Sequence, residues 1–285
     1  MEKYNPAEEK VETMPYKVSH VRLVPWDGEA TPRSQFDYMM FVGDLIWYSR
    51  TNPDLAWRAS NLARFMQCPG PQHVAAAKHV LRSIRRNMGQ GITYHGSDAV
   101  LMQSYDHRNK IIMCTDADFD HTGENASVTG VAAMMNGGVI AYRSTGQTTK
   151  SNTTTEAETK AIAVAVAMAS ALTDLHGEFT HVEHGPVRLM TDSAGAVSVI
   201  TRGLDTKTCA SYKRAQHMAE EAVEQGKVWL DLIPGGDNPA DILTKQVGNI
   251  GDFHNKGGII SGKVPYLYES KDVTKLLARS HVVSR

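Results

Sequence analysis

The sequence has few cysteines, no long hydrophobic run and almost no net charge. Its 285 residues include three cysteines, Cys68, Cys114 and Cys209, which lie far apart and form no CxxC pair. This usage argues against a zinc knuckle and favours a reducing compartment. The formal net charge of -1 excludes a global electrostatic field that would attract a polyanion. Any binding of a charged partner must therefore come from local clusters of side chains.

Features that would indicate a membrane or secreted protein are also missing. No charged n-region, apolar h-region and cleavage site open the chain. The longest nearly uncharged apolar run, residues 161–172, is shorter than the roughly 20 residues that a membrane-spanning helix needs. We therefore expect an intracellular protein, cytoplasmic or nuclear, with no membrane partner.

Four regions are expected along the chain. Residues 1–36 contain four prolines and little periodicity, which predicts an extended arm or linker. Residues 37–108 have apolar residues at helical spacing and include a stretch, 41–48, that is apolar on several sides and is expected to be buried. Residues 109–247 give three strands joined by turns and then strands separated by helices. This order predicts an α/β domain with a mixed sheet flanked by helices. Residues 248–285 are expected to form a C-terminal tail.

Four acidic residues stand at the ends of predicted strands or the starts of predicted helices. Asp116 directly follows a short apolar run that is typical of a buried strand, and Asp192 ends an alternating strand pattern. Glu158 lies near the start of a long helix, on the face that is expected to pack on the sheet. Asp241 takes the third position of a helix that Asn238 begins. All four are expected to gather at one edge of the sheet.

Each acid also has a purely structural interpretation. Asp116 could start a turn. Glu158 could complete a capping box with Thr155. Asp192 could cap a helix, and Asp241 could interact with a helix dipole. Their matching positions together favour a shared site over four separate structural roles.

A cluster of four carboxylates would repel itself unless cations occupy it. Hard oxygen ligands without cysteine select Mg²⁺ or Mn²⁺ over zinc. Two such ions about 3.5–4 Å apart can activate a water and stabilise the leaving oxygen in phosphodiester cleavage. The residues alone therefore predict a site for two Mg²⁺ or Mn²⁺ ions.

The helical region carries an excess of positive charge. Between residues 50 and 86, seven arginines and lysines are accompanied by one acid, Asp54. Such a block either covers a solvated helix face or follows the phosphates of a nucleic acid. The residues expected to bind nucleic acid are Arg58, Lys78, Arg82, Arg85 and Arg86.

Several motifs resemble, in order and spacing, the ribonuclease H domain of copia-type retrotransposon polyproteins. They are residues 115–119 (TDADF), 154–158 (TTEAE), 191–196 (TDSAGA) and 240–245 (ADILTK), with 128–130 (VTG) and 144–147 (STGQ) between them. The upstream segments 42–45 (VGDL) and 51–55 (TNPDL) look like the end of the reverse transcriptase of the same polyprotein. The resemblance covers roughly residues 36–245. The polymerase signature Tyr-x-Asp-Asp is absent.

The resemblance implies an RNase H-like mixed five-stranded sheet, residues 109–247, after a small helical reverse-transcriptase remnant of thumb or connection type, residues 37–108. It implies endonucleolytic cleavage of the RNA strand of an RNA–DNA hybrid with two Mg²⁺ or Mn²⁺ ions. Asp116, Glu158, Asp192 and Asp241 match the metal-binding catalytic acids, and Glu158 is preferred to Glu156 because Glu158 and Ala161 fit the family's Glu-x-x-Ala step. The family also suggests the polymerase portion of the polyprotein as a partner and a virus-like particle or the nucleus as the location.

Recognition of RNA requires contacts to its 2′-hydroxyl groups, which DNA lacks. The Ser/Thr-rich loop before the long helix supplies suitable donors: Thr148, Thr149, Ser151 and Asn152. Two other functions stay open. The chain could be a nucleic-acid-binding module that has lost turnover, or a structural scaffold with the same fold.

Overall fold

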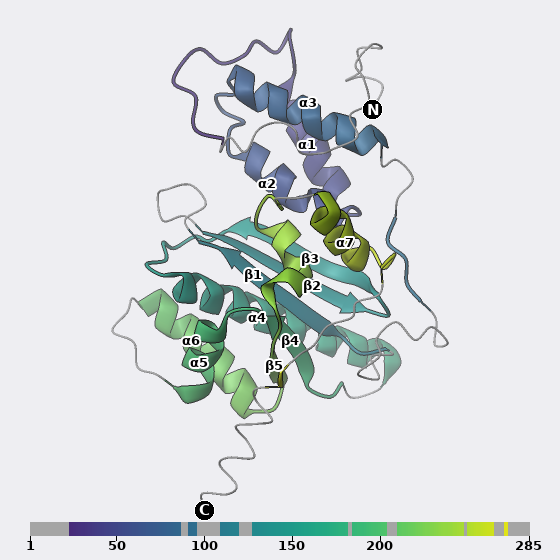
Figure 1. Cartoon of the computed structure of the whole chain (residues 1–285), viewed down its shortest axis with the longest axis vertical. Coiled ribbons are helices and arrows are strands. Elements are labelled where there is room, and N and C mark those ends of the chain that lie inside the picture. The colour runs from purple at the N-terminus through teal and green to yellow at the C-terminus, as the bar shows by residue number, and fades with distance from the viewer. Residues whose placement is uncertain are drawn as a thin grey trace, which may run out of the picture.

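The structure is a computed structural model that describes residues 23–86, 91–95, 109–119, 127–181, 184–203, 210–247, 250–264 and 271–272. Most of the expected arm, and most of the connection between residues 87 and 108, lie outside these ranges. Figure 1 shows a helical unit above a sheet that has helices on both faces.

The helical unit consists of α1 (Tyr38–Ser49), the 3₁₀ turn η2 (Pro53–Leu55), α2 (Ala56–Ala63) and α3 (Pro71–Arg86). Asp37 caps α1 by accepting a hydrogen bond from the backbone N–H of Met40 at 3.1 Å. One apolar face of each helix packs into a common core that includes Phe41, Leu62 and Ile84. This core holds the unit together.

The stretch 41–48 of α1 was predicted to be buried because it is apolar on several sides, but part of it is exposed. Trp47 is 71 % exposed, and Met39, Met40 and Ile46 are also exposed. Its described neighbours, α2, α3 and η2, leave these side chains uncovered. The guanidinium of Arg50 lies 5.0 Å from the Trp47 ring and shields part of it.

The sheet is mixed, as predicted. Its strands are β1 (Ile112–Asp118), β2 (Val128–Met135), β3 (Gly138–Gly146), β4 (Val187–Thr191), β5 (Val228–Leu232) and β6 (Lys271–Asp272). They lie in the order β3-β2-β1-β4-β5-β6. The pairs β1–β2, β2–β3 and β5–β6 are antiparallel, whereas β1–β4 and β4–β5 are parallel. The predicted α/β fold is confirmed, and the described sheet adds the two-residue β6 to the five expected strands.

A two-residue turn joins β2 to β3. Asn136 and Gly137 both have positive φ angles, 51° and 87°. This conformation matches the turn that suits the twist of a hairpin, and Asn-Gly is its preferred sequence. The predicted hairpin therefore forms, with its turn one residue before the expected Gly137-Gly138.

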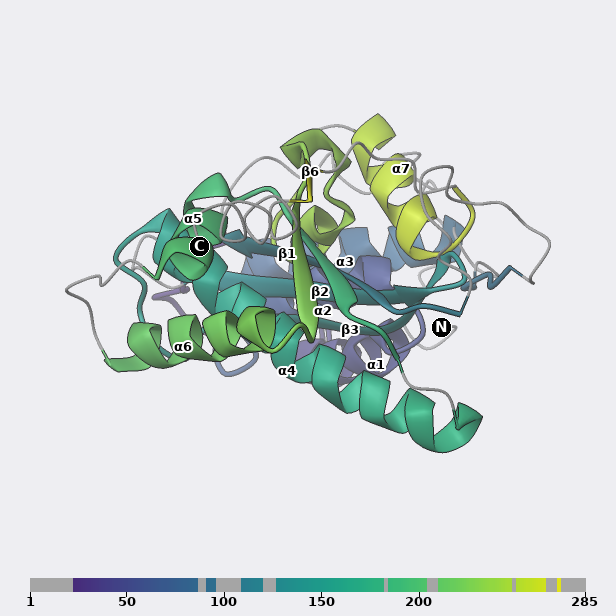
Figure 2. The same cartoon turned by 90° about the horizontal axis from the view of Figure 1, so that it is seen from below.

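Helices cover both faces of the sheet, as Figure 2 shows for α4 and α7. On one face, α4 (Thr154–Thr180), α5 (Ala194–Arg202) and α6 (Ala210–Glu224) pack on residues such as Met113 and Val131. On the other face, α2, the 3₁₀ helix η4 (Pro239–Leu243) and α7 (Ile250–Ile260) pack on Cys114 and Ala132. Successive strand residues point to opposite faces, so β1 contributes to both cores.

Helix α4 has 27 residues and, by length and composition alone, could cross a membrane. Of its most apolar 18-residue stretch, 28 % is buried. The apolar run 161–172 lies inside this helix. Ile162, Ala165 and Ala169 from it pack in the core with the sheet, and Ala161 packs with Ala117 of β1. This packing accounts for one apolar face of the helix.

The expected C-terminal tail contains structure that the sequence did not predict. Helix α7 inserts Phe253, Ile259 and Ile260 into the core beside the sheet. Its glycines, Gly257 and Gly258 among them, are unfavourable in a helix interior and mask the periodicity. Packing of its apolar residues stabilises the helix instead. The predicted domain boundaries stay predictions.

Candidate active site

Three of the four predicted acids meet at one point of the structure. One carboxylate oxygen each from Asp116, Glu158 and Asp192 lies within 4.8 Å of the others. Asp116 is on β1 and Asp192 directly follows β4. Because these strands are adjacent and parallel, their carboxyl ends lie side by side. The first turns of α4 bring Glu158 to the same place. We call these three residues the acidic triad.

Neutral side chains hold the triad in position. The Thr244 hydroxyl donates a short hydrogen bond to Asp116. The side-chain amide of Asn238 donates to the Thr115 carbonyl at 2.9 Å and to Asp192 at 3.3 Å. Asn238 is fully buried and also caps η4. Its sequence pattern indicated the start of a helix and gave no sign of the contact with Asp192.

A close backbone approach completes the pocket around Asp192. A Cβ atom added to Gly235 would lie 2.9 Å from Oδ2 of Asp192. Any larger residue at this position would therefore press on the carboxylate. This contact explains one glycine of the Pro-Gly-Gly loop that follows β5.

The triad is electrostatically strained without a cation. Burial, followed by the charges of Asp116 and Asp192, raises the pKa of Glu158 to about 9, although the Ala117 N–H donates to it. Burial also raises the pKa of Asp116 to about 6, against the lowering effect of Lys245. The Oε2 atom of Glu158 is buried, and no described residue donates a hydrogen bond to it. A divalent cation fits here because it would pair with this oxygen and offset the repulsion.

The fourth acid, Asp241, lies beside the triad but is paired with lysines. It is 7 % exposed and stands on η4. Lys245 contacts its Oδ1 at 2.8 Å and reaches Asp116 at 3.5 Å. Lys256, on α7, forms a short ion pair with its Oδ2. The sequence predicts four acids in one cluster, and the structure pairs both oxygens of the fourth, Asp241, with lysines.

Glu158 contributes its carboxylate to the acidic triad, whereas the carboxylate of Glu156 has other partners. Glu156 is buried and pairs with Lys160 at 2.8 Å. It also accepts a hydrogen bond from the backbone N–H of Asn152 at 3.0 Å. The cap of α4 is Thr153, which accepts from the Glu156 N–H. The alternative capping box of Thr155 with Glu158 is therefore not formed.

The predicted hydrogen-bond donors of the loop before α4 differ in exposure, because one is buried and three are exposed. Ser151 is fully buried, donates to Gln147 at 2.8 Å and accepts from Lys160 at 3.1 Å. It stabilises the loop and is not accessible to a substrate, which corrects its predicted binding role. Thr148, Thr149 and Asn152 are exposed.

The predicted basic residues also differ in exposure, because one is buried and three are partly exposed. Arg58 is 5 % exposed, stacks on the Phe253 ring at 4.6 Å and donates to Ser83 at 3.4 Å. It connects α2 to α7 and does not face a polyanion. Lys78, Arg82 and Arg85 lie partly exposed on α3, which Figure 1 shows farther from the sheet than α2. The side chain of Arg86 lies outside the described part of the structure.

Comparison with known proteins gives curated relatives and similar solved structures. No family model matches the chain. It is 29 % identical over 212 residues to the retrovirus-related Pol polyprotein from transposon TNT 1-94 of Nicotiana tabacum, covering 74 % of this chain. It is 25 % identical over 233 residues to the Pol polyprotein from transposon RE2 of Arabidopsis thaliana, covering 80 % of this chain. In both cases it spans 15 % of the relative's length.

A shorter relative is the secreted RxLR effector protein 161 of Plasmopara viticola, 30 % identical over 121 residues, which are 42 % of this chain and 79 % of that protein.

Similar solved structures are RNase H domains. One from Mycobacterium tuberculosis has a TM-score of 0.37 and 15 % identity, covering 47 % of this chain and 90 % of that one. LC11-RNase H1, solved with an RNA/DNA hybrid, has a TM-score of 0.35 and 21 % identity, covering 47 % and 94 %. Retrovirus-related Pol polyproteins of plant transposons are thus relatives of this chain, which spans a small part of their length.

Proposed function

We propose that this chain is a metal-dependent ribonuclease H that cleaves the RNA strand of RNA–DNA hybrids. The observation that carries the proposal is the acidic triad, with its oxygens within 4.8 Å of one another at the carboxyl ends of β1 and β4. The motif matches around Asp116, Glu158, Asp192 and Asp241 and the homology to Pol polyproteins support it.

The triad supplies hard oxygen ligands, which suit Mg²⁺ or Mn²⁺. A bound ion of this kind activates a water and stabilises the leaving oxygen of a phosphodiester. Asp116, Glu158 and Asp192 would hold the first ion. A second ion, as the sequence predicts, needs Asp241 as a ligand in addition.

Other residues position these groups. Thr244 fixes the orientation of Asp116, and Asn238 fixes that of Asp192. Lys245, with its side chain 41 % exposed, can turn from Asp116 and Asp241 towards a phosphate. Thr148, Thr149 and Asn152 are the proposed contacts to 2′-hydroxyl groups. Lys78, Arg82 and Arg85 are the proposed contacts to phosphates, and the polymerase portion of a polyprotein is the proposed protein partner.

The experiment compares labelled RNA–DNA hybrid, duplex DNA and duplex RNA, each with Mg²⁺ and with chelator. We expect cleavage of the RNA strand in the hybrid, with metal, and a loss of turnover in Asp192→Asn. Asp174→Asn, an exposed acid on the same α4 helix as Glu158, is the matched control and should keep full activity.

Equal cleavage of all three substrates, or cleavage that persists in chelator, would contradict the proposal. Hybrid binding without any cleavage would instead support the alternative of an inactive nucleic-acid-binding module.

A further inference from the structure

A buried lysine from the unexpected helix α7 reaches into the candidate active site. The side chain of Lys256 is 6 % exposed, and its ammonium forms an ion pair with Oδ2 of Asp241. It also donates to the Gly235 carbonyl at 3.3 Å. Lys245 occupies the other oxygen of Asp241. Both oxygens of this acid therefore already have a cationic partner.

The two lysines differ in how readily they can leave. Lys245 has a side chain that is 41 % exposed, so it can exchange Asp241 for water at little cost. Lys256 is buried, so its ammonium would have neither a carboxylate partner nor water if it left Asp241, and this costs free energy. Release of Asp241 by Lys256 therefore requires movement of α7 as well as rotation of a side chain.

The helical unit contacts α7 through a stacking interaction, in addition to the contacts that η2 makes with this helix. Phe253 lies one turn before Lys256 on α7, and the buried guanidinium of Arg58 from α2 stacks on its ring at 4.6 Å. Arg58 is held in turn by Ser83 of α3. Arg58 thus links α3 to Phe253, and Phe253 shares a helix face with Lys256, the partner of Asp241.

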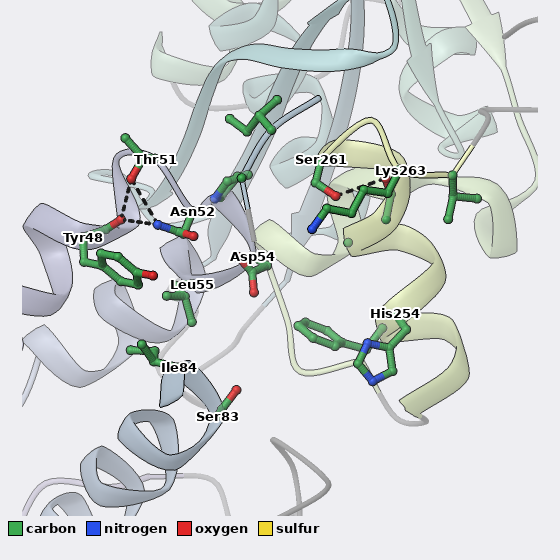
Figure 3. Close-up of a pocket in the computed structure, with 17 residues that line it drawn as sticks. Tyr48, Thr51, Asn52, Asp54, Leu55, Ser83, Ile84, His254, Ser261 and Lys263 are labelled. Carbon is green, nitrogen blue, oxygen red and sulfur yellow. Dashed lines mark hydrogen bonds between the residues drawn. The ribbon is translucent and has the colours of Figure 1, made fainter. Parts of the chain in front are cut away.

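Beside this stacking contact, the interface between α7 and the helical unit contains a pocket of about 280 Å³. Figure 3 shows His254 and Lys263, from the α7 region, across the pocket from Ser83 of α3, with Asp54 of η2 between them. The stacking of Arg58 on Phe253 is one of the contacts that position α7, together with the apolar residues of this helix in the core.

We propose that Lys256 is a positioning residue that competes with a second divalent ion for Asp241, and that the docking of α7 on the helical unit sets the strength of this competition. The inference rests on the proposed function and deepens it. The triad binds the first ion without disturbing Lys256. A second ion binds only when the ammonium leaves Oδ2 of Asp241, because the two cations repel each other at one carboxylate.

The test is direct titration of the full chain with Mn²⁺, followed by electron paramagnetic resonance and calorimetry. Wild type should bind one ion tightly and a second ion weakly. Lys256→Met should leave the first dissociation constant unchanged and tighten the second by about tenfold or more. Phe253→Leu keeps an apolar side chain but loses the ring on which Arg58 stacks, and should tighten the second by a smaller factor. Lys227→Met, an exposed lysine before β5, is the matched control and should behave as wild type.

Charge and packing are separated by Lys256→Arg, which should bind the second ion as weakly as wild type does. Equal tightening in Lys256→Arg and Lys256→Met, or an unchanged second constant in both Lys256→Met and Phe253→Leu, would overturn the inference. If no variant binds even the first ion, the proposed function itself fails. A first ion that binds normally, with no effect of Lys256 on the second, removes only the role of Lys256.

Discussion

Glu158 combines burial with two neighbouring carboxylates, and this combination makes the metal-free protein sensitive to pH. Its pKa is raised from 4.5 to about 9 in the folded chain. The folded state therefore binds more protons than the unfolded state between these values, and stability falls as pH rises. The stabilising contribution of the protonated group is complete below pH 4.5 and is lost as pH rises through about 9.

The prediction is that, in chelator, the free energy of unfolding of wild type declines from pH 5 to pH 9 more steeply than that of Glu158→Gln. Urea unfolding at several pH values measures the difference. The variant cannot ionise at this position, so its advantage should grow with pH. Parallel curves for the two proteins would show that Glu158 is not held in the environment described.

Glu156 is only two residues away but has a different role. Glu156→Gln removes the partner of the buried Lys160, which keeps oxygen contacts to residues 149–151. We expect a loss of about 1–3 kcal/mol in stability, the scale of a broken buried polar contact, with turnover per folded molecule retained. Glu158→Gln should show the reverse, with turnover lost and metal-free stability kept. Thermal unfolding and the cleavage assay together distinguish the two, and an opposite ranking would contradict the assignment.

Some residues of the candidate site could be predicted from the sequence, and others could not. The positions of Asp116, Glu158 and Asp192 could be predicted because strand ends and helix starts are visible as local patterns. The contact of Asn238 with Thr115 could not, since it joins segments 123 positions apart. The contact of Lys256 with Asp241 could not, because helix α7 was not predicted. The burial of Arg58 was missed for the same reason, because its partner Phe253 lies 195 positions later on α7.

At the scale of elements, the packing of η4 against β2 requires a glycine. Gly130 pairs with Asp116 across the β1–β2 ladder. A Cβ atom at this position would lie 2.6 Å from Cγ2 of Thr244 and 3.0 Å from the Ala240 carbonyl oxygen. The VTG motif of the second strand therefore has a physical reason: it lets η4 bring Thr244 and Asp241 to the triad.

Gly130→Ala should destabilise the protein by about 1–3 kcal/mol, as overpacking does, and should weaken metal binding because Thr244 is displaced from Asp116. Gly146→Ala, on β3 of the same sheet, is the control, because a Cβ atom there meets nothing within 4 Å. Equal unfolding midpoints and metal affinities for both variants would mean that the close packing of η4 is not required.

Helix α3 carries the part of the basic surface that stays exposed to solvent. If Arg82 and Arg85 contact phosphates, the affinity for a hybrid should fall log-linearly with salt, with a slope of about 0.7–0.9 for each contact. Arg82→Ala/Arg85→Ala should flatten this slope by up to two such contacts. Arg214→Ala on α6 serves as the control. Unchanged slope and affinity in the double variant would leave α3 as a solvated scaffold.

At the scale of the whole molecule, the sheet and its flanking helices followed from periodicity, whereas the role of the C-terminal region did not. Strands β1 to β5 alternate or run apolar in ways that the sequence displays directly. Helix α7 is rich in glycine, and its stability depends on burial of Phe253 and Ile260 against the core. The exposed face of α1 was missed because an apolar sequence does not show which neighbours are present to cover it.

The proposed function depends most on the binding of a divalent metal ion by Asp116, Glu158 and Asp192. Anomalous diffraction from crystals of the full chain soaked in Mn²⁺ tests it directly. We predict a strong anomalous peak with oxygen atoms of these three carboxylates about 2.1–2.2 Å away, the range for a hard cation of this size. The same soak of Asp192→Asn should give a weaker peak or none. An empty triad in wild-type crystals, with Mn²⁺ bound elsewhere, would contradict the account.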